Sequence, residues 1–406
     1  MSPTLADLLP PELLDYTLRN LTLTELRVVK GSCSTLCRAA RRTLCSKEWR
    51  AGEHGWRGSR GIWALGMYGS VSWRLARKET IVRYHAANDM WEVITDVPEA
   101  VALPAQRELA ACGGKLFFAG GLVGIPGAGE ETKRVVSWDP DSNTWEEQPP
   151  MLRSRFAFVL ASHEDILYAL GGWETGQRTN TYGESFDVRT RKWSALPPNI
   201  FLPRRCSAAA VLGNVLYVLG GENVNGATAT MESLDLSSED AEWHIATAMG
   251  TDRRHLGACA LAGKLYVVGG DNDEVGPRDE GEGVDAIHDV EVYDPGKGEW
   301  EMQGPLEMVY EHSLLTLDDS RLLIVGGERD ELRYGEGYQG GEASLYMLEY
   351  DTFDRTYYDD WARVDWKANV GSALSFEAER RKRWATPYNE RRDEPEFEMT
   401  SKAVVL

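Results

Sequence analysis

The sequence predicts a mainly β protein built from six repeated units of four short strands, preceded by a small helical segment. Three observations lead to this fold class. A short apolar run that ends in two glycines recurs along the chain, and Gly and Trp are abundant, with 40 and 14 copies among 406 residues. After the first fifty residues no segment of helical length has helical periodicity, whereas short strands with periodic Gly and aromatic residues are typical of turn-rich β architectures.

The repeated run defines the period of the chain. It reads KLFFAGG, ILYALGG, VLYVLGG, KLYVVGG and LLIVGG, and the first glycines of these pairs are residues 120, 171, 220, 269 and 326. GIWALGM, around Gly66, is a degenerate sixth copy. We expect each run to be the second strand of its unit, and the glycines to adopt positive φ and to let neighbouring backbones approach closely.

A second pattern follows each glycine pair. A polar loop leads to a strand-like run, to a turn rich in Asp, Pro and Asn as in VVSWDPDSNTW, and to a closing tryptophan. We expect these tryptophans to pack between adjacent sheets. They are Trp91, Trp145, Trp193, Trp243, Trp300 and, in a looser copy, Trp361.

Glycine pair, turn and tryptophan at a spacing near 50 residues resemble the kelch repeat over residues 58–378. The resemblance implies a six-bladed kelch β-propeller with one four-stranded sheet per blade and with the first strand of each unit innermost. Blade one has no first strand of its own before its repeated run. We expect residues 371–378, GSALSFEA, to supply it and to close the ring, and we expect residues 379–406 to form a charged, solvated tail.

Residues 5–50 differ in texture, because their leucines fall at helical spacing. One interpretation is a helical cap on the propeller. The pattern LPPELLDYTL also resembles the F-box, although Thr17, Ser32 and Leu36 depart from it. That resemblance implies the substrate-recognition subunit of an SCF-type ubiquitin ligase, in which this segment binds a Skp-type adaptor of the cullin ligase core and the propeller binds the target. The implied adaptor-binding residues are Leu9, Pro10, Leu13, Leu14, Leu18, Leu21 and Leu26.

Basic residues gather where each unit enters its first strand, in PAQR, RSRF, PRRC and DRRH, with YEHS at the same place in unit six. If first strands are innermost, these residues surround the channel mouth and could bind an acidic or phosphorylated segment. The alternative is a local structural role in each blade. The candidate target-binding residues are Arg107, Arg155, Arg204, Arg205, Arg253, Arg254, His255 and His312.

Charge and composition exclude several other classes of protein. A formal charge of −20 disfavours nucleic acid and anionic membranes as partners, and no apolar run is long enough to span a bilayer. Six cysteines without CxxC pairs indicate reduced thiols in the cytoplasm or nucleus, and a buried role for Cys33 and Cys37 is favoured over metal binding. We expect no catalytic residue, metal or cofactor. The alternatives are a kelch-propeller oxidase or lyase and a protein-interaction scaffold outside the ubiquitin system.

Overall fold

The computed structural model describes most of the repeat region. The described residues are 62–70, 78–85, 90–124, 129–174, 182–197, 204–238, 240–272, 287, 289–305, 312–316, 321–325, 347–351, 356–358, 365–366, 374–375 and 395–405. The predicted helical segment at residues 5–50 lies outside them, and so do Trp361 and most of the segments that follow the glycine pairs of units five and six.

The chain divides into two compact units. The larger unit holds residues 62–82, 94–362 and 386–406, and the smaller unit holds residues 1–61, 83–93 and 363–385. In the smaller unit, β28 (Asp365–Trp366) pairs antiparallel with β29 (Leu374–Ser375).

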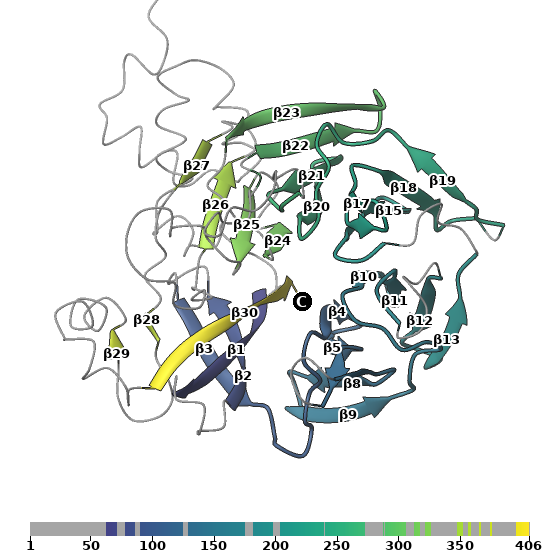
Figure 1. The fold of residues 1–406 in the computed structure, drawn as a ribbon. Helices are drawn as coiled ribbons and strands as arrows, with labels where there is room; N and C mark the ends of the chain where they lie inside the picture. Colours follow the sequence, from purple (N-terminus) through teal and green to yellow (C-terminus); the bar gives the residue numbers. More distant parts are fainter. Residues whose placement is uncertain are drawn as a thin grey trace, which may run out of the picture. The chain divides into compact units, whose positions relative to one another are not determined.

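The described residues form six four-stranded antiparallel sheets, which we call blades one to six (Figure 1). Blade one consists of β30 (Pro395–Val405), β1 (Ile62–Ser70), β2 (Lys78–His85) and β3 (Met90–Asp96). Blade two consists of β4 (Glu108–Cys112), β5 (Lys115–Ala119), β8 (Val135–Asp139) and β9 (Thr144–Gln148). Blade three consists of β10 (Val159–His163), β11 (Ile166–Leu170), β12 (Glu184–Asp187) and β13 (Lys192–Ala195).

The other three blades repeat this order. Blade four consists of β14 (Ala208–Leu212), β15 (Val215–Leu219), β18 (Met231–Asp235) and β19 (Trp243–Ala246). Blade five consists of β20 (Gly257–Leu261), β21 (Lys264–Val268), β22 (Asp289–Asp294) and β23 (Glu299–Pro305). Blade six consists of β24 (Ser313–Thr316), β25 (Arg321–Val325), β26 (Met347–Asp351) and β27 (Thr356–Tyr358). In blades two to six the repeated run is the second strand, as predicted.

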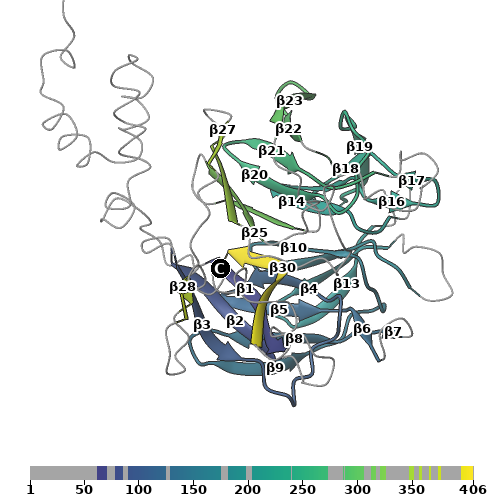
Figure 2. The same ribbon diagram turned by 60° about the vertical axis from the view of Figure 1, so that its left-hand side comes forward.

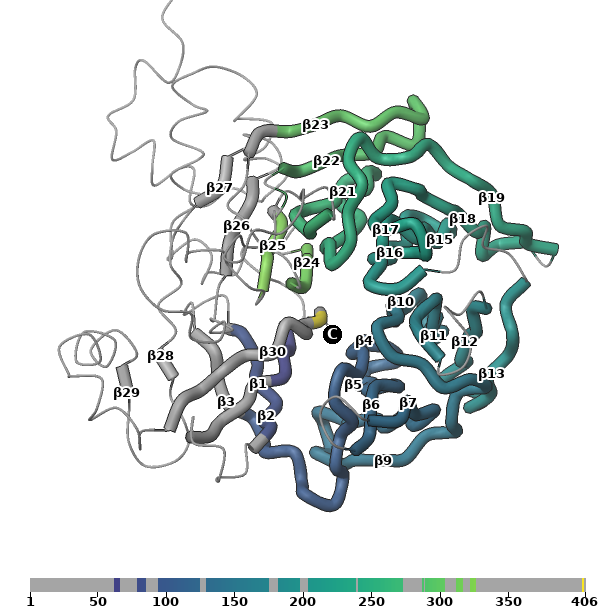
Figure 3. The backbone as a smooth tube through the Cα atoms, viewed as in Figure 1, coloured from purple at the N-terminus to yellow at the C-terminus, as the bar shows by residue number. Residues whose placement is uncertain are grey.

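The first strands of the blades are neighbours within the larger unit. β4, β10, β14, β20 and β24 contact one another in succession, and β30 contacts both β24 and β4 (Figures 1 and 2). The tube in Figure 3 shows β4 and β10, the first strands of blades two and three, on the inner side of their blades. The prediction that first strands are innermost agrees with this succession of contacts.

The prediction for the closing strand of blade one is wrong. β1 pairs antiparallel with β30, from Ile62 opposite Val405 to Ser70 opposite Pro395, with a bulge between Ala64 and Gly66. Leu374 and Ser375, the described residues of the predicted segment, do not take this place, because they pair with β28 instead. The expected charged tail therefore contains a strand. Its sequence PEFEMTSKAVV mixes charged with apolar residues, an alternation typical of strands with one solvated face, and pairing satisfies the otherwise open edge of β1.

Apolar side chains fill the spaces between consecutive blades. Trp63 of blade one packs with Phe118 and Trp138 of blade two, and Phe117 of blade two packs with Phe186 of blade three. Equivalent clusters join blades three and four, four and five, and five and six. Three closing tryptophans contribute as predicted. Trp145 packs in the first of these clusters. The ring centroids of Trp193 and Phe186 are 5.0 Å apart, and those of Trp300 and Tyr293 are 5.2 Å apart.

The glycine pairs make room for the backbone of the segment that leads into the first strand of the same blade. Gly121 and Gly221 have φ of 93° and 95°. A Cβ atom on Gly121 would lie 2.3 Å from the carbonyl oxygen of Ala105, and one on Gly221 would lie 2.7 Å from that of Arg205. Glycine is required here both by the positive φ and by the close approach of the neighbouring backbone.

Candidate interaction face and the kelch family

The segment that enters each first strand, here called the link, pairs with the residue after the glycine pair of the same blade. Isolated β-bridges join Ala105 to Leu122 in blade two and Phe156 to Trp173 in blade three. The same bridge joins Arg205 to Glu222 in blade four and Arg254 to Asp271 in blade five. In these blades the links and the post-glycine loops therefore lie on the same side. We call this side the link face.

Three of the predicted target-binding arginines are buried inside the blades. Arg155, Arg204 and Arg253 are no more than 1% exposed. Their guanidinium groups donate to the carbonyl oxygens of Gly171, Gly220 and Gly269, at 3.0, 3.1 and 3.0 Å. Each also pairs with a buried glutamate on the third strand of its blade, namely Glu184, Glu232 and Glu291.

The backbones of the same arginines reach the preceding blade. The carbonyl oxygens of Arg155, Arg204 and Arg253 accept hydrogen bonds from Gly121, Gly172 and Gly221, at 2.9, 2.9 and 2.8 Å. Each arginine thus links two consecutive glycine pairs, one through its main chain and one through its side chain. A buried cation requires such partners, because leaving it unpaired would cost several kcal/mol. These three side chains are structural, which corrects their assignment to target binding.

Arg107 is also buried and paired, but it occupies a different position in its link. Pro104 takes the place of the buried arginine in the link of blade two, and Arg107, 9% exposed, donates to its carbonyl oxygen at 2.6 Å. The second nitrogen lies 2.5 Å from Glu79 Oε1 on β2. Burial lowers the pKa of Arg107, and Glu79 opposes that shift by stabilising the charge. Arg107 therefore connects blade two to blade one and is not available to a target.

His312 is also buried. It is 8% exposed, and neither ring nitrogen has a hydrogen-bond partner among the described residues. Its ring packs against the first strand of blade five, because a Cβ atom on Gly257 would lie 2.6 Å from Nε2. Burial lowers the pKa of His312 to about 4, so the ring is neutral at physiological pH. Its assignment to target binding is corrected in the same way.

The remaining three candidates lie together on the link face. Arg205 Nη2 lies 2.9 Å from Glu222 Oε1, and Arg254 Nη1 lies 3.0 Å from Glu222 Oε2. Arg254 Nε donates to Asp271 Oδ1 at 2.6 Å, and His255 Nδ1 lies 2.8 Å from Asp271 Oδ2. Arg205, Glu222, Arg254, Asp271 and His255 thus form a continuous chain of alternating charge across blades four and five, which we call the charged row.

The charged row carries a net positive charge near neutral pH. Burial favours the neutral ring of His255, but its hydrogen bonds to Asp271 and Cys206 and the charges of these groups outweigh burial and raise its pKa to about 10. Burial also opposes ionisation of Glu222 and Asp271, but the bonds and charges of the neighbouring cations lower the pKa of both. Three cations therefore face two anions.

Sequence reasoning missed the residues that hold these cations in place. Trp173 lies beneath Arg205, with the guanidinium carbon 5.1 Å from the ring centroid. Trp173, Glu222 and Asp271 each follow a glycine pair directly, and the bridges show that this position faces the link. The strand order could have identified them, because it places the post-glycine residue beside the link.

Exposed apolar side chains also occur on the link face. Two short hairpins follow glycine pairs, β6 (Leu122–Val123) with β7 (Glu130–Glu131) and β16 (Glu222–Asn223) with β17 (Gly226–Ala227). Val123 is 53% exposed, and Val224, in the turn of the second hairpin, is 70% exposed.

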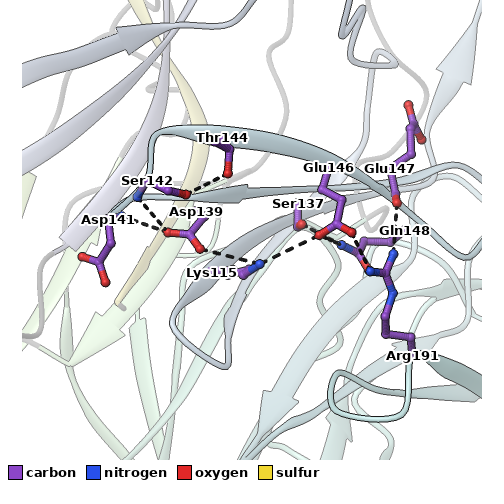
Figure 4. Close-up of polar contacts among 10 residues, drawn as sticks. All are labelled: Lys115, Ser137, Asp139, Asp141, Ser142, Thr144, Glu146, Glu147, Gln148 and Arg191. Carbon is purple, nitrogen blue, oxygen red and sulfur yellow. Dashed lines mark hydrogen bonds and ion pairs between the residues drawn. The ribbon is translucent and has the colours of Figure 1, made fainter.

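Charged residues at the other end of the strands are engaged with one another and with turns. Lys115 lies 3.6 Å from Asp139 and 3.9 Å from Glu146, and Arg191 of blade three pairs with Glu146 at 2.5 Å (Figure 4). Asp139 also accepts hydrogen bonds from the backbone of Asp141 and Ser142. Asp139 thus stabilises the turn between the third and fourth strands of blade two, which distinguishes this end from the link face.

In the part of the chain that the structure describes, no group of three or more His, Cys, Asp or Glu side chains is arranged to hold a metal ion. Nor does that part contain a helix long and apolar enough to cross a membrane.

The sequence of the repeat region is similar to those of several known proteins. Kelch-like protein 36 of Bos taurus is 28% identical over 232 residues, which are 55% of this chain and 36% of that protein. Kelch-like protein 34 of Homo sapiens is 25% identical over 63% of this chain and 39% of its own length. Alpha-scruin of Limulus polyphemus is 24% identical over 68% of this chain and 30% of its own length. The chain thus matches about a third of the length of each of these relatives, from 30% to 39%.

A solved structure shares the fold. The structure of YjhT superposes with a TM-score of 0.57 at 18% identity, over 69% of this chain and 90% of that one. The model of the KLHDC2/KLHL20/DRC7 kelch-repeats domain matches residues 106–327, which are more than half of the chain. Together with the four-stranded sheets and the glycine pairs, this match shows that the chain belongs to the kelch-repeat family.

Proposed function

We propose that this protein is the substrate-recognition subunit of an SCF-type ubiquitin ligase. In this proposal the six blades form a closed propeller whose link face binds an acidic or phosphorylated segment of the target. Residues 5–50 bind a Skp-type adaptor through Leu9, Pro10, Leu13, Leu14, Leu18, Leu21 and Leu26, and the complex acts in the cytoplasm or nucleus.

The charged row is the observation that supports target binding. It carries more positive than negative charge on a chain with a formal charge of −20. The side chain of Arg205 is 34% exposed and is held both by Glu222 and by the ring of Trp173. A guanidinium that is already oriented loses little conformational entropy when its planar fork meets a carboxylate or phosphate. Val123 and Val224 supply exposed apolar area on the same face.

Binding of defined peptides tests the target-binding part. Fluorescence anisotropy would compare labelled peptides containing four glutamates, a phosphoserine between aspartates, or four lysines. We expect the full chain to bind the first two in preference to the third, with an affinity that falls as salt rises. Arg205→Ala and Arg254→Ala should each weaken binding by about 1–3 kcal/mol. Arg189→Ala is the matched control, because Arg189 is 80% exposed at the other end of the strands. Equal binding of the acidic and basic peptides would contradict the proposal.

The ligase part rests on the resemblance of residues 5–50 to the F-box and is tested separately. Replacing Leu13 and Leu14 by Asp would place two charges on an apolar helical face. We expect the double variant to lose co-purification with a Skp-type adaptor while its peptide binding and thermal melting stay unchanged. Undiminished adaptor binding would overturn the SCF assignment and would leave the kelch repeats as an interaction scaffold.

A further inference from the structure

Among the described residues, four of the six exposed large apolar side chains lie on the link face. Two are the valines of the post-glycine hairpins described above. The other two belong to blade three: Leu152, in its link, is 47% exposed, and Tyr182, just before β12, is 43% exposed. The remaining pair, Ile245 on β19 and Met302 on β23, lies on fourth strands. Single exposed apolar residues are ordinary on protein surfaces, whereas several on one side indicate an interaction surface.

The backbone of blade three fixes Leu152 and Tyr182 on this face. The N–H of Leu152 donates to Glu184 Oε2 at 2.6 Å, and the carbonyl oxygen of Tyr182 accepts a hydrogen bond from Arg155 Nη1 at 3.2 Å. Glu184 and Arg155 are the buried ion pair of this blade, and the same Nη1 donates to the carbonyl oxygen of Gly171. Both exposed residues are therefore anchored beside the glycine pair through their main chains, while their side chains remain exposed.

Arg153 connects Leu152 to Tyr182. It follows Leu152 in the link, and its guanidinium carbon lies 4.5 Å from the centroid of the Tyr182 ring. Its Nη1 lies 3.4 Å from Glu174 Oε2, so the cation is matched by one carboxylate. We call Leu152, Arg153, Glu174 and Tyr182 the blade-three subsite. This subsite presents an aromatic ring and an aliphatic side chain beside a neutral ion pair.

The blade-three subsite adjoins the charged row but differs from it in charge. Glu174 follows Trp173 in the chain, and Trp173 lies beneath Arg205, the first cation of the row. The row has three cations against two anions, whereas the subsite has one of each. An acidic side chain therefore gains little attraction over the subsite and would be placed against Leu152 and Tyr182, whereas an apolar side chain matches them.

We propose that the blade-three subsite binds an aromatic or large aliphatic side chain of the target, next to the acidic residues that the charged row binds. The inference rests on the proposed function and specifies its substrate class, a segment with one apolar anchor at an end of its acidic run. The Tyr182 ring offers a large and rigid contact area with little side-chain entropy to lose. The aliphatic stem of Arg153 and the side chain of Leu152 extend this apolar area.

Fluorescence anisotropy with a factorial set of peptides tests the inference on the full chain. Each labelled peptide contains four glutamates or four lysines, with phenylalanine or alanine placed at the N-terminal or the C-terminal end of the run. We expect phenylalanine to tighten binding of the glutamate peptide about tenfold over alanine in one of the two orders, because one aromatic side chain leaves water.

Side-chain variants assign this gain to the subsite. Tyr182→Ala and Leu152→Ala should each reduce the advantage of phenylalanine to less than about threefold, whereas Tyr182→Phe, which keeps the ring, should retain it. Met302→Ala is the matched control, because Met302 is 59% exposed on a fourth strand rather than in a link. The ratio of the two affinities is measured within each variant, and binding of the alanine peptide together with thermal melting verifies that the variant is folded.

The outcomes separate this inference from the proposed function. If the glutamate peptides bind more tightly than the lysine peptides but phenylalanine gives no advantage in either order, the subsite is contradicted and the acidic preference stands. If glutamate and lysine peptides bind equally, yet phenylalanine improves both and Tyr182→Ala removes the gain, the subsite stands and the acidic preference is contradicted. A gain that survives Tyr182→Ala overturns the subsite, and so does the absence of binding by every peptide.

Discussion

Arg204 donates a hydrogen bond to Glu232 across 2.9 Å, with both side chains buried between the link and the third strand of blade four. The same pairing joins Arg155 to Glu184 in blade three and Arg253 to Glu291 in blade five. One ion pair in each of these blades therefore holds the link, the glycine pair and the third strand together.

Removal of one partner of this pair should destabilise the protein strongly. Arg204→Leu removes the buried cation that pairs with Glu232, and we expect it to lower the free energy of unfolding by about 3–5 kcal/mol in chemical denaturation. Glu232→Leu should cost about as much, and the double variant should cost less than the sum, because it leaves no unpaired charge. Arg189→Ala, at an 80% exposed site, should change stability by no more than about 0.5 kcal/mol. Additive single effects would show that the pair is not coupled.

The glycine pairs give a second prediction. Gly221→Ala combines a φ of 95° with a Cβ position 2.7 Å from the carbonyl oxygen of Arg205, so the link of blade four must move. Gly213→Ala has a φ of 62° and meets no atom within 4 Å, and it should cost only about 1–2 kcal/mol of backbone strain. We expect the thermal melting temperature to fall clearly further for Gly221→Ala. Equal shifts for the two variants would exclude a role for close packing.

The closing strand of blade one gives a third prediction. Truncation after residue 394 removes β30 and leaves the edge of β1 unpaired, so we expect aggregation or a large loss of thermal stability. Deletion of Leu406 alone, which keeps all of β30, is the control and should be nearly neutral. A soluble and equally stable protein ending at residue 394 would show that blade one does not need this strand.

The buried histidine gives a prediction about pH. His312 has a pKa of about 4 in the folded protein, against about 6.5 in the unfolded chain. Between these values the unfolded chain binds more protons, so the contribution of His312 is fully present above pH 6.5 and is lost as the pH falls toward 4.

We therefore expect His312→Leu to melt with a shallower decline between pH 6.5 and 4 than the unmodified protein. His244→Gln, at an exposed position on β19, should leave the decline unchanged. Parallel melting profiles of His312→Leu and the unmodified protein would mean that His312 does not titrate in this range.

Local pattern was sufficient for much of the fold and for the location of the candidate face. The repeated run could be predicted as a strand because an apolar segment this short, ending in glycines, is too short for a helix. The pairing of links with post-glycine residues followed from strand order alone, and Trp173, Glu222 and Asp271 could have been named from it. The choice of residues 371–378 as the closing strand failed, because two short segments fit an open edge equally well and only long-range pairing selects one.

The sequence by itself determined the six repeats, the place of the glycine pairs and the gathering of basic residues in the links. All of these depend on backbone geometry and on the period of apolar residues, which neighbouring positions express. Only the tertiary structure decided what each basic residue does. Arg204 and Arg205 are adjacent in the chain, yet Arg204 is buried against Glu232 while Arg205 lies on the surface over Trp173. Successive residues of an extended link point to opposite sides. Whether a carboxylate lies on a given side depends on strands about 20 to 40 residues away in the sequence.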